Sequence, residues 1–167
     1  MPCRQPLPRL WLMTDERQDE GLWAALERLP RGSGVVFRHH GLAPAERRKL
    51  FARVRRVAKR RRLLLLAGAG LRGDGVHGGR GRGLRSASAH SLRELKTAER
   101  SGAALIFLSP AFPTRSHPGA RALGPVRFGL ISAQARVPII ALGGVDARKA
   151  RRLPNIYGWA GIDAWSD

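Results

Sequence analysis

Eight short apolar segments, separated by helix-sized or glycine-rich stretches, are the feature of this sequence that most limits its fold. A segment that is apolar throughout, rather than at alternate residues, is typical of a strand buried on both faces of a parallel sheet. Between most of these segments, apolar residues recur at helical spacing instead. The predicted strands cover residues 9–14, 34–38, 63–66, 75–77, 84–89, 104–109, 138–142 and 161–165.

This alternation of strands and helices predicts an α/β fold, the (β/α)8 TIM barrel. The predicted helices cover residues 20–29, 45–61, 92–101, 128–135 and 147 to about 153. The 167 residues suit one domain, 1–167, and fall short of the roughly 250 that are typical of this fold. We therefore expect helices to be shortened or missing after the third, fourth and eighth strands. A doubly wound open sheet would need fewer strands and a sharper glycine fingerprint after the first.

The net charge of +19, from 31 Lys and Arg against 12 Asp and Glu, leaves two interpretations open. Such basicity is typical of proteins that bind nucleic acid or another polyanion. Only four of the basic residues are lysine and aromatic residues make up 6%, which favours compositional bias. The basic segment 47–62 also carries Leu50, Phe51, Val54 and Val57 on one helical stripe, so its charge is expected on the solvent face of a packed helix. A bound polyanion would need more than one such element, and nucleic acid is not the partner we expect.

Other features of the sequence are consistent with a cytoplasmic protein. There is no run of about 18 apolar residues and hence no expected membrane span. The first residues lack the apolar segment of a signal peptide, and Cys3 has no partner for an internal disulfide. The glycine-rich segment 78–83 favours a surface loop over a phosphate- or RNA-binding motif.

Candidate functional residues gather where the predicted strands end, which is where barrels of this kind carry their sites. All five histidines fall at this face. Tight histidine spacing is absent, so zinc is not predicted. The residues at these strand ends are Arg38, His39, His40, His77, Ser88, His90, Thr114, Arg115, Ser116, His117, Gly143, Gly144 and Ser166.

Simpler structural roles remain open for several of them. His77 has the alternative of a hydrogen-bonded core histidine, and His90 has that of an i, i+4 pair with Glu94. At Gly143 and Gly144, a strand, a glycine turn and a helix start follow one another, so bare N–H groups can approach an anion. The alternative there is a helix-start turn without a ligand.

Six motifs occur along the chain in the order LWLMTDER, VVFRHH, GDGVHGG, SASAHSLRE, IFLSPAFPTRSHPGARALG and VPIIALGGV. Together they resemble the thiamine phosphate synthase family, which includes the TenI-type thiazole tautomerases. The resemblance implies a (β/α)8 barrel that joins hydroxymethylpyrimidine pyrophosphate to thiazole phosphate, giving thiamine phosphate and pyrophosphate. In that family, Mg²⁺ and basic residues stabilise the departing pyrophosphate.

The resemblance also implies roles for particular residues. Catalytic roles are expected for His40 and His117, which stand where the family has lysines, and for Ser88, which matches the serine of its S-x-H turn. The residues expected to bind substrate or phosphate are Arg38, His77, His90, Thr114, Ser116, Gly143, Gly144 and Ser166.

The magnesium site is where the sequence departs from the family. The segment after the third strand, LLAGAGLRG, lacks the family's aspartate, and Arg82 stands at the second aspartate position. We assign no metal ligand, and Arg80 and Arg82 are candidates to neutralise pyrophosphate directly.

Four interpretations therefore stay open. The protein is a synthase with impaired activity, a tautomerase in which His117 replaces a histidine near Pro110, a non-catalytic binder of phosphorylated ligands or, as the least expected, a basic protein that binds nucleic acid. Small phosphorylated substrates are the expected partners. An exposed barrel flank would favour a homodimer.

Overall fold

The eight strands form one closed parallel barrel, as the sequence predicts. A computed structural model of the chain describes residues 6–18, 20–68, 70–114, 119, 121–162 and 165. Each strand pairs with its neighbours in sequence, and the last closes against the first, where Leu10 lies beside Trp159. The strands are β1 (Leu10–Met13), β2 (Gly34–Phe37), β3 (Leu64–Ala67), β4 (Gly75–His77), β5 (Leu84–Ala89), β6 (Leu105–Leu108), β7 (Ile139–Ala141) and β8 (Gly158–Gly161).

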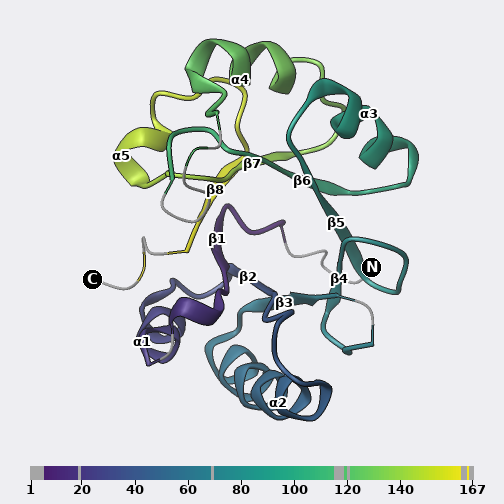
Figure 1. Cartoon of the computed structure of the whole chain (residues 1–167), viewed down its shortest axis with the longest axis vertical. Coiled ribbons are helices and arrows are strands. Elements are labelled where there is room, and N and C mark those ends of the chain that lie inside the picture. Colours follow the sequence, from purple (N-terminus) through teal and green to yellow (C-terminus); the bar gives the residue numbers. More distant parts are fainter. Residues whose placement is uncertain are drawn as a thin grey trace.

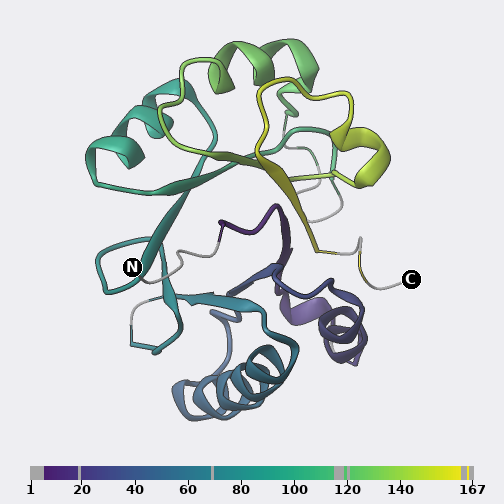
Figure 2. The same cartoon turned by 180° about the vertical axis from the view of Figure 1, so that it is seen from behind.

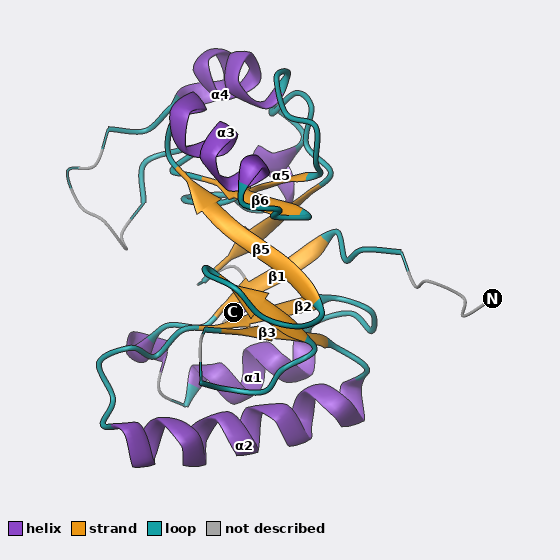
Figure 3. Cartoon of the chain, turned by 90° about the vertical axis from the view of Figure 1, so that its right-hand side faces the viewer, coloured by secondary structure: helices purple, strands orange, loops and turns teal. Residues whose placement is uncertain are grey.

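The helices stand on two opposite sides of the barrel (Figures 1 and 3). On one side are η1 (Glu16–Gln18), α1 (Gly21–Arg28) and α2 (Pro44–Arg61); on the other are α3 (Leu92–Arg100), α4 (Gly124–Ser132) and α5 (Ala147–Ala150). The view from behind shows the same division (Figure 2). In the described part of the chain, no α-helix follows β3, β4 or β8. The ring of helices is therefore open beside β4 and again beside β8. None of the described helices is long and apolar enough to cross a membrane.

The inside of the barrel is filled by apolar side chains from β1, β2, β3, β6, β7 and β8. Trp11 of β1 lies in its centre and meets Phe107 edge-on, with ring centroids 5.3 Å apart. Gly34 of β2 makes room for the indole, since a Cβ there would lie 2.2 Å from Trp11 Cε3. Two further apolar clusters fill the space between the barrel and its helices, one under α1 and α2 and the other under α3, α4 and α5.

The last strand lies earlier in the sequence than predicted, and the prediction of a strand at 161–165 is wrong. Gly158 pairs with Ile140 of β7, and a Cβ at this glycine would lie 1.9 Å from the carbonyl oxygen of Arg9. Close backbone approach therefore requires glycine at a strand position that reads as a turn in the sequence. The chain then leaves the barrel, and the ring of Trp165 stacks on that of Trp159 at 5.0 Å.

Two of the predicted helices have different bounds, while α3 forms almost as predicted. α4 begins at Gly124 rather than at 128, with a proline in its first turn. α5 ends at Ala150, before the predicted end near residue 153. At the start of α3, Ser91 Oγ caps the helix by accepting a hydrogen bond from the N–H of Glu94 at 3.2 Å.

A loop covers β4 in place of a helix. Residues 78–83 fold over the outer face of this strand, where a Cβ on Gly81 would lie 2.2 Å from Val76 Cγ2. The N–H of Gly78 donates to the carbonyl of Ser86 at 2.8 Å, which ties the start of the loop to β5. The glycines allow the backbone itself to make the cover, and they leave the arginines of the loop pointing outward.

Candidate functional site

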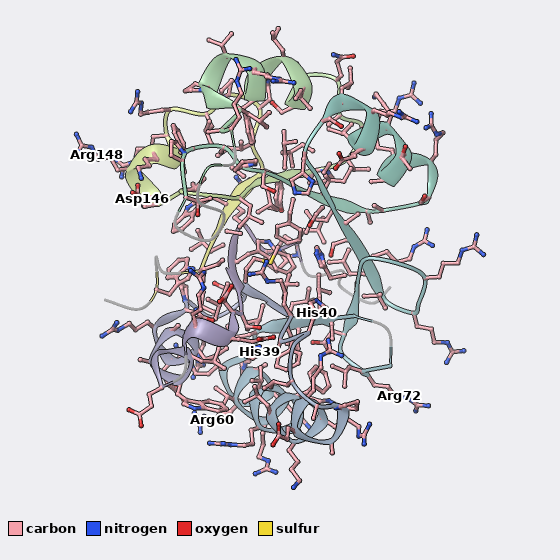
Figure 4. The ribbon with its side chains drawn as sticks, in the orientation of Figure 1. His39, His40, Arg60, Arg72, Asp146 and Arg148 are labelled. Atoms are coloured by element: carbon pink, nitrogen blue, oxygen red, sulfur yellow. The ribbon has the colours of Figure 1, made fainter. Side chains whose placement is uncertain are left out.

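The described histidines all lie at the carboxyl ends of strands. His39 and His40 follow β2, His77 ends β4 and His90 follows β5. Figure 4 labels the first two on the loop after β2. Their common face is the one that carries function in barrels of this type. The prediction for His117 lies outside the described residues.

Arg38 is fastened to the end of β1. Its backbone N–H donates to Thr14 Oγ1, its Nε donates to the carbonyl of Thr14, and its Nη2 pairs with Asp15 Oδ2, each at 3.0 Å. Burial alone raises the pKa of Asp15, but the hydrogen bonds and charge of Arg17, with the charge of Arg38, hold that pKa below its usual value. The guanidinium is therefore fixed at the barrel opening beside one carboxylate.

His39 serves the structure rather than an open site. Its backbone is left-handed, with φ of 39°, and its ring stacks on Phe37 with centroids 4.9 Å apart. Nδ1 is 2.9 Å from Thr14 Oγ1, so the imidazole belongs to the same network as Arg38. Burial lowers the pKa of His39 in spite of the nearby carboxylates.

His40, in contrast, is exposed. It lines a cavity of about 320 Å³ between the loops after β2 and β3, together with Arg47 and Arg48. Arg47 is anchored there by donating from Nε and Nη2 to the carbonyl of Arg38, at 3.2 and 3.0 Å. Two arginines and one histidine around a small cavity form a cationic environment suited to an anion.

His77 connects the barrel interior to the opening. Its Nδ1 is 2.9 Å from the buried Ser86 Oγ, and its Nε2 is 3.2 Å from the exposed Ser88 Oγ. Burial lowers the pKa of His77 to about 4, and the charges of Arg38 and His40 act in the same direction. The imidazole is neutral near neutral pH, and in either tautomer it fixes the position of the Ser88 hydroxyl.

His90 adopts the simpler of its two predicted roles. Its ring Nδ1 pairs with Glu94 Oε2 at 2.8 Å, and its backbone N–H donates to the same oxygen at 2.9 Å. These bonds lower the pKa of Glu94. Within the described part of the chain, no hydrogen bond joins His90 to His77 or Arg38, so it stands apart from them.

The glycine turn after β7 forms the other half of the opening. Gly143 and Gly144 have φ of 89° and 61°, and a Cβ on Gly144 would lie 2.3 Å from the carbonyl oxygen of Pro113. The N–H of Phe112 donates to the carbonyl of Gly143 at 3.0 Å, so the loop after β6 packs directly on the turn. Among the described residues, no acceptor binds the N–H groups of the two glycines.

The loop after β6 also carries the predicted hydroxyls. Thr114 follows the stretch that packs on the glycine turn and is half-buried. Arg115, Ser116 and His117 lie outside the described residues, as does Ser166. The structure thus places Pro113, the residue before Thr114, against Gly144, and brings His77 within hydrogen-bond distance of Ser88.

Carboxylates near the opening already have partners. Asp15 pairs with Arg38, and Glu16 Oε1 accepts the N–H of Gly41 at 2.6 Å. Asp74 precedes β4 at the opposite end of the barrel, where it accepts the N–H of Leu65 at 2.8 Å. Among the described residues, no group of three or more His, Cys, Asp or Glu is arranged to hold a metal ion. The described carboxylates at the opening are thus engaged with Arg38 and with the N–H of Gly41.

Three residues of the opening were not singled out by the sequence. Asp15 orients Arg38, Ser86 holds His77, and Lys149 donates from Nζ to the carbonyl of Gly144 at 3.0 Å. The Thr-Asp pair directly after the first strand was a usable signal for Asp15. Ser86 and Lys149 were hidden, because a strand residue and a basic helix residue carry no distinctive local pattern.

The family profile described as thiamine monophosphate synthase matches residues 84–164, from β5 to beyond β8. "Putative thiamine-phosphate synthase 2" of Aquifex aeolicus is 34% identical over 179 residues, which cover 93% of this chain and 96% of that protein. The "Thiamine-phosphate synthase" of Pyrococcus furiosus is 33% identical over 67 residues, covering 40% of this chain and 32% of that protein.

A solved structure extends this likeness to the fold. "Thiamine phosphate pyrophosphorylase from Pyrococcus furiosus" superposes with a TM-score of 0.79 at 24% identity, over 98% of this chain and 89% of that one. At this identity the superposition supports the barrel, while the Aquifex aeolicus relative, matched over almost its whole length, supports the ancestry. The chain belongs to the thiamine phosphate synthase family.

Proposed function

We propose that this protein binds thiazole phosphate and hydroxymethylpyrimidine pyrophosphate at the carboxyl end of the barrel and joins them into thiamine phosphate. The observation that carries the proposal is the Gly143–Gly144 turn. Its N–H groups have no described acceptor, its left-handed backbone suits glycine, and packing against Pro113 leaves no room for a side chain. Such a turn takes an anionic oxygen at close range.

The phosphate of the thiazole occupies the glycine turn in this proposal. Thr114 adds its hydroxyl from the loop after β6, and Ser116 adds a second one. Lys149 keeps the turn in shape through its bond to the carbonyl of Gly144 and brings positive charge to the same loop. His117, next to Ser116, is the candidate for the cation that the family supplies by lysine.

The pyrophosphate of the pyrimidine faces Arg38 and His40. The bond between the pyrimidine methylene and the pyrophosphate oxygen breaks with its electron pair leaving on oxygen, and the thiazole nitrogen forms the new C–N bond to that methylene. Arg38 stabilises the negative charge that grows on the leaving group, held in position by Thr14 and Asp15. Ser88, oriented by His77, donates its hydroxyl to the reacting substrate.

A second candidate is a binder of phosphorylated ligands that does not turn them over. It is favoured by one observation: Arg38 already has a carboxylate partner, while the described loops after β3 and β4 offer no carboxylate to a metal at their strand ends. The thiazole-phosphate half of the site would then be kept and the pyrophosphate half weakened. A tautomerase acting on thiazole phosphate would use His117 as its proton carrier.

The experiment is to incubate the purified protein with both substrates, with and without Mg²⁺, and to measure thiamine phosphate by mass spectrometry. Product formation supports synthesis, and its magnesium dependence tells whether the family's metal takes part. Binding of thiazole phosphate in calorimetry, with no product under either condition, would overturn synthesis in favour of the second candidate.

Two substitutions separate the halves of the site and serve as each other's control. Thr114→Val is expected to weaken thiazole phosphate about tenfold with little effect on the pyrimidine substrate, because one hydrogen bond to a charged group is worth about 1.5 kcal/mol. Arg38→Gln is expected to weaken binding of the pyrimidine substrate at least about tenfold, with little effect on thiazole phosphate. Equal weakening of both ligands by either substitution would contradict the assigned division.

A further inference from the structure

A long groove runs along the outer flank of the barrel, apart from the glycine turn and Arg38. It has a volume of about 840 Å³ and lies between the 78–83 loop, the outer face of β5 and α3. It exists because no helix follows β4: the loop covers Val76 but leaves the neighbouring strand uncovered. One end of the groove reaches Ser88 at the barrel opening, and the other reaches Ala103 before β6.

Arginines from three separate elements line this groove. Arg80 comes from the loop, Arg85 from β5, and Arg93 and Arg100 from α3. On the helix, Arg93, Thr97 and Arg100 follow i, i+4, i+7 spacing and so share one face. Arg93 and Arg100 are exposed and stand about 10 Å apart along the helix axis.

The positive charges of the groove are not neutralised within the described part of the protein. None of its four arginines forms an ion pair with a described carboxylate. Glu94 at the groove wall is bound to His90, and the nearby Glu99 is bound to Lys96 at 3.1 Å. Two of the arginines form neutral hydrogen bonds within the chain: Arg85 donates to the carbonyl of Gly102 at 2.7 Å, and Arg100 donates to Thr97 Oγ1 at 3.2 Å. A concave surface whose guanidinium groups have no carboxylate partner is suited to an external anion.

The shape and surroundings of the groove fit an extended anion better than a compact one. Its floor is made of small residues, Ala87, Ala98 and Ala103, and no aromatic side chain lines it. There is thus no surface to stack a ring, whereas guanidinium groups spaced along the walls match a row of phosphates. Positive charge also continues beyond the groove, at Arg72 on the loop before β4 and along α2 (Figure 4).

We infer that this flank groove binds the phosphodiester backbone of a nucleic acid without reading its sequence. The basic segment 47–62 alone did not support such a role, because a polyanion needs more than one charged element. The structure supplies the further elements, since the loop, β5 and α3 converge on one groove. The groove meets the proposed synthase site only at Ser86 and Ser88, and its arginines lie outside the Gly143–Gly144 turn and Arg38.

The test is the fluorescence anisotropy of a labelled oligouridylate titrated with the whole protein at several salt concentrations. We expect binding that weakens steeply with salt, since each phosphate contact to a single strand contributes a slope of about −0.7 in log K against log salt. The double variant Arg93→Gln with Arg100→Gln should bind at least about tenfold more weakly and reduce that slope by about 1.4.

A matched control removes the same charge elsewhere. Arg151→Gln with Arg152→Gln alters two exposed arginines after α5, on the other side of the barrel's upper half (Figure 1). This variant should stay within about twofold of the unmodified protein. Arg93→Lys with Arg100→Lys should retain most of the affinity, because a lysine still contacts a phosphate as a point charge.

Three results would overturn the inference. The first is equal weakening by the two glutamine double variants, which would mean diffuse attraction by net charge. The second is displacement of the oligouridylate by polyglutamate at matched charge, which would point to an acidic protein. The third is absence of binding at moderate salt by a protein whose thermal unfolding is normal.

Discussion

The ring of helices has two gaps, one beside β8 and one beside β4, and different kinds of side chain occupy them. Beside β8, Trp165 returns to the barrel, stacks on Trp159 at an interplanar angle of 6° and donates its Nε1–H to the carbonyl of Trp11 at 3.2 Å. Beside β4, a glycine-rich loop lies on Val76 and arginines line the remaining groove. One opening is filled by apolar surface, while the other is left concave and charged.

This difference separates stability from recognition. Stacked indoles remove apolar area from water and gain nothing from a ligand. Guanidinium groups without partners repel one another and cost stability until an anion arrives. A gap that served only the stability of the fold would be expected to be filled by apolar side chains, as the gap beside β8 is. The gap beside β4 retains this repulsion between its arginines, and we therefore assign a ligand to it and not to the gap beside β8.

The glycine loop at β4 gives the largest expected effect. Gly83→Ala would place a Cβ 2.0 Å from the carbonyl oxygen of Asp74 at a φ of 81°, so we expect a loss of about 4 kcal/mol in the free energy of unfolding, from clash and backbone strain together. Gly79→Ala in the same loop has a similar φ of 87° but open space around it, so only about 1 kcal/mol should be lost. Denaturant unfolding of both variants measures this, and equal losses would refute the role of the loop as a packed cover.

The pH dependence of the unfolding free energy also distinguishes the region of β4, which contains His77, from the tryptophan stack beside β8. The pKa of His77 falls from 6.5 in the unfolded chain to about 4 in the folded one. The unfolded state therefore takes up the proton first, and stability present above pH 6.5 is lost as the pH falls towards 4, by about 3 kcal/mol. Burial also lowers the pKa of His39, which adds to the loss in the same direction.

His77→Gln should remove most of this pH dependence, since glutamine does not titrate and the smaller shifts of His39 and of carboxylates such as Glu94 remain. Trp165→Ala should leave the pH dependence of the unfolding free energy unchanged, because the tryptophan stack lies beside β8 and contains no titrating group. The measurement is the unfolding free energy of both variants across this pH range. A dependence that survives intact in His77→Gln would show that other groups cause it.

The tryptophan stack gives the smallest of the three effects. Trp165→Ala is expected to lose about 2 kcal/mol of unfolding free energy, less than a fully buried tryptophan, because its ring is half-buried. Trp165→Phe should recover about half of that. The Arg93→Gln, Arg100→Gln double variant should change stability by less than about 0.5 kcal/mol, as exposed substitutions do. If the arginine double variant lost more unfolding free energy than Trp165→Ala, the assignment of stability to the tryptophan stack and of recognition to the groove would be wrong.

The order of strands and helices could be predicted because most strands of a closed parallel barrel are apolar throughout, and this pattern is local. β8 could not be found, since Gly158 is set by its contact with Arg9 across the barrel. The start of α4 was missed for a related reason: the helix begins in a segment, Gly124 and Pro125, that reads as a break when tertiary contacts are unknown.

The site was predicted best where one short segment carries it. The Gly143–Gly144 turn has the backbone that its sequence indicates. Arg38 lies at the end of β2, where the sequence places it, but its orientation depends on Asp15, which follows a different strand. The missing helix after β4 was predicted, but the flank groove was not, because the 78–83 loop, β5 and α3 that line it come together only in the folded chain.

The tryptophan at the centre of the barrel has a consequence for how this sequence can change over time. Trp11 fits only because Gly34 opposite it has no side chain. A larger residue at 34 would expel the indole, and a smaller one at 11 would leave a void beside the glycine. The two positions are therefore expected to covary among relatives, each limiting the mutations that the other can accept.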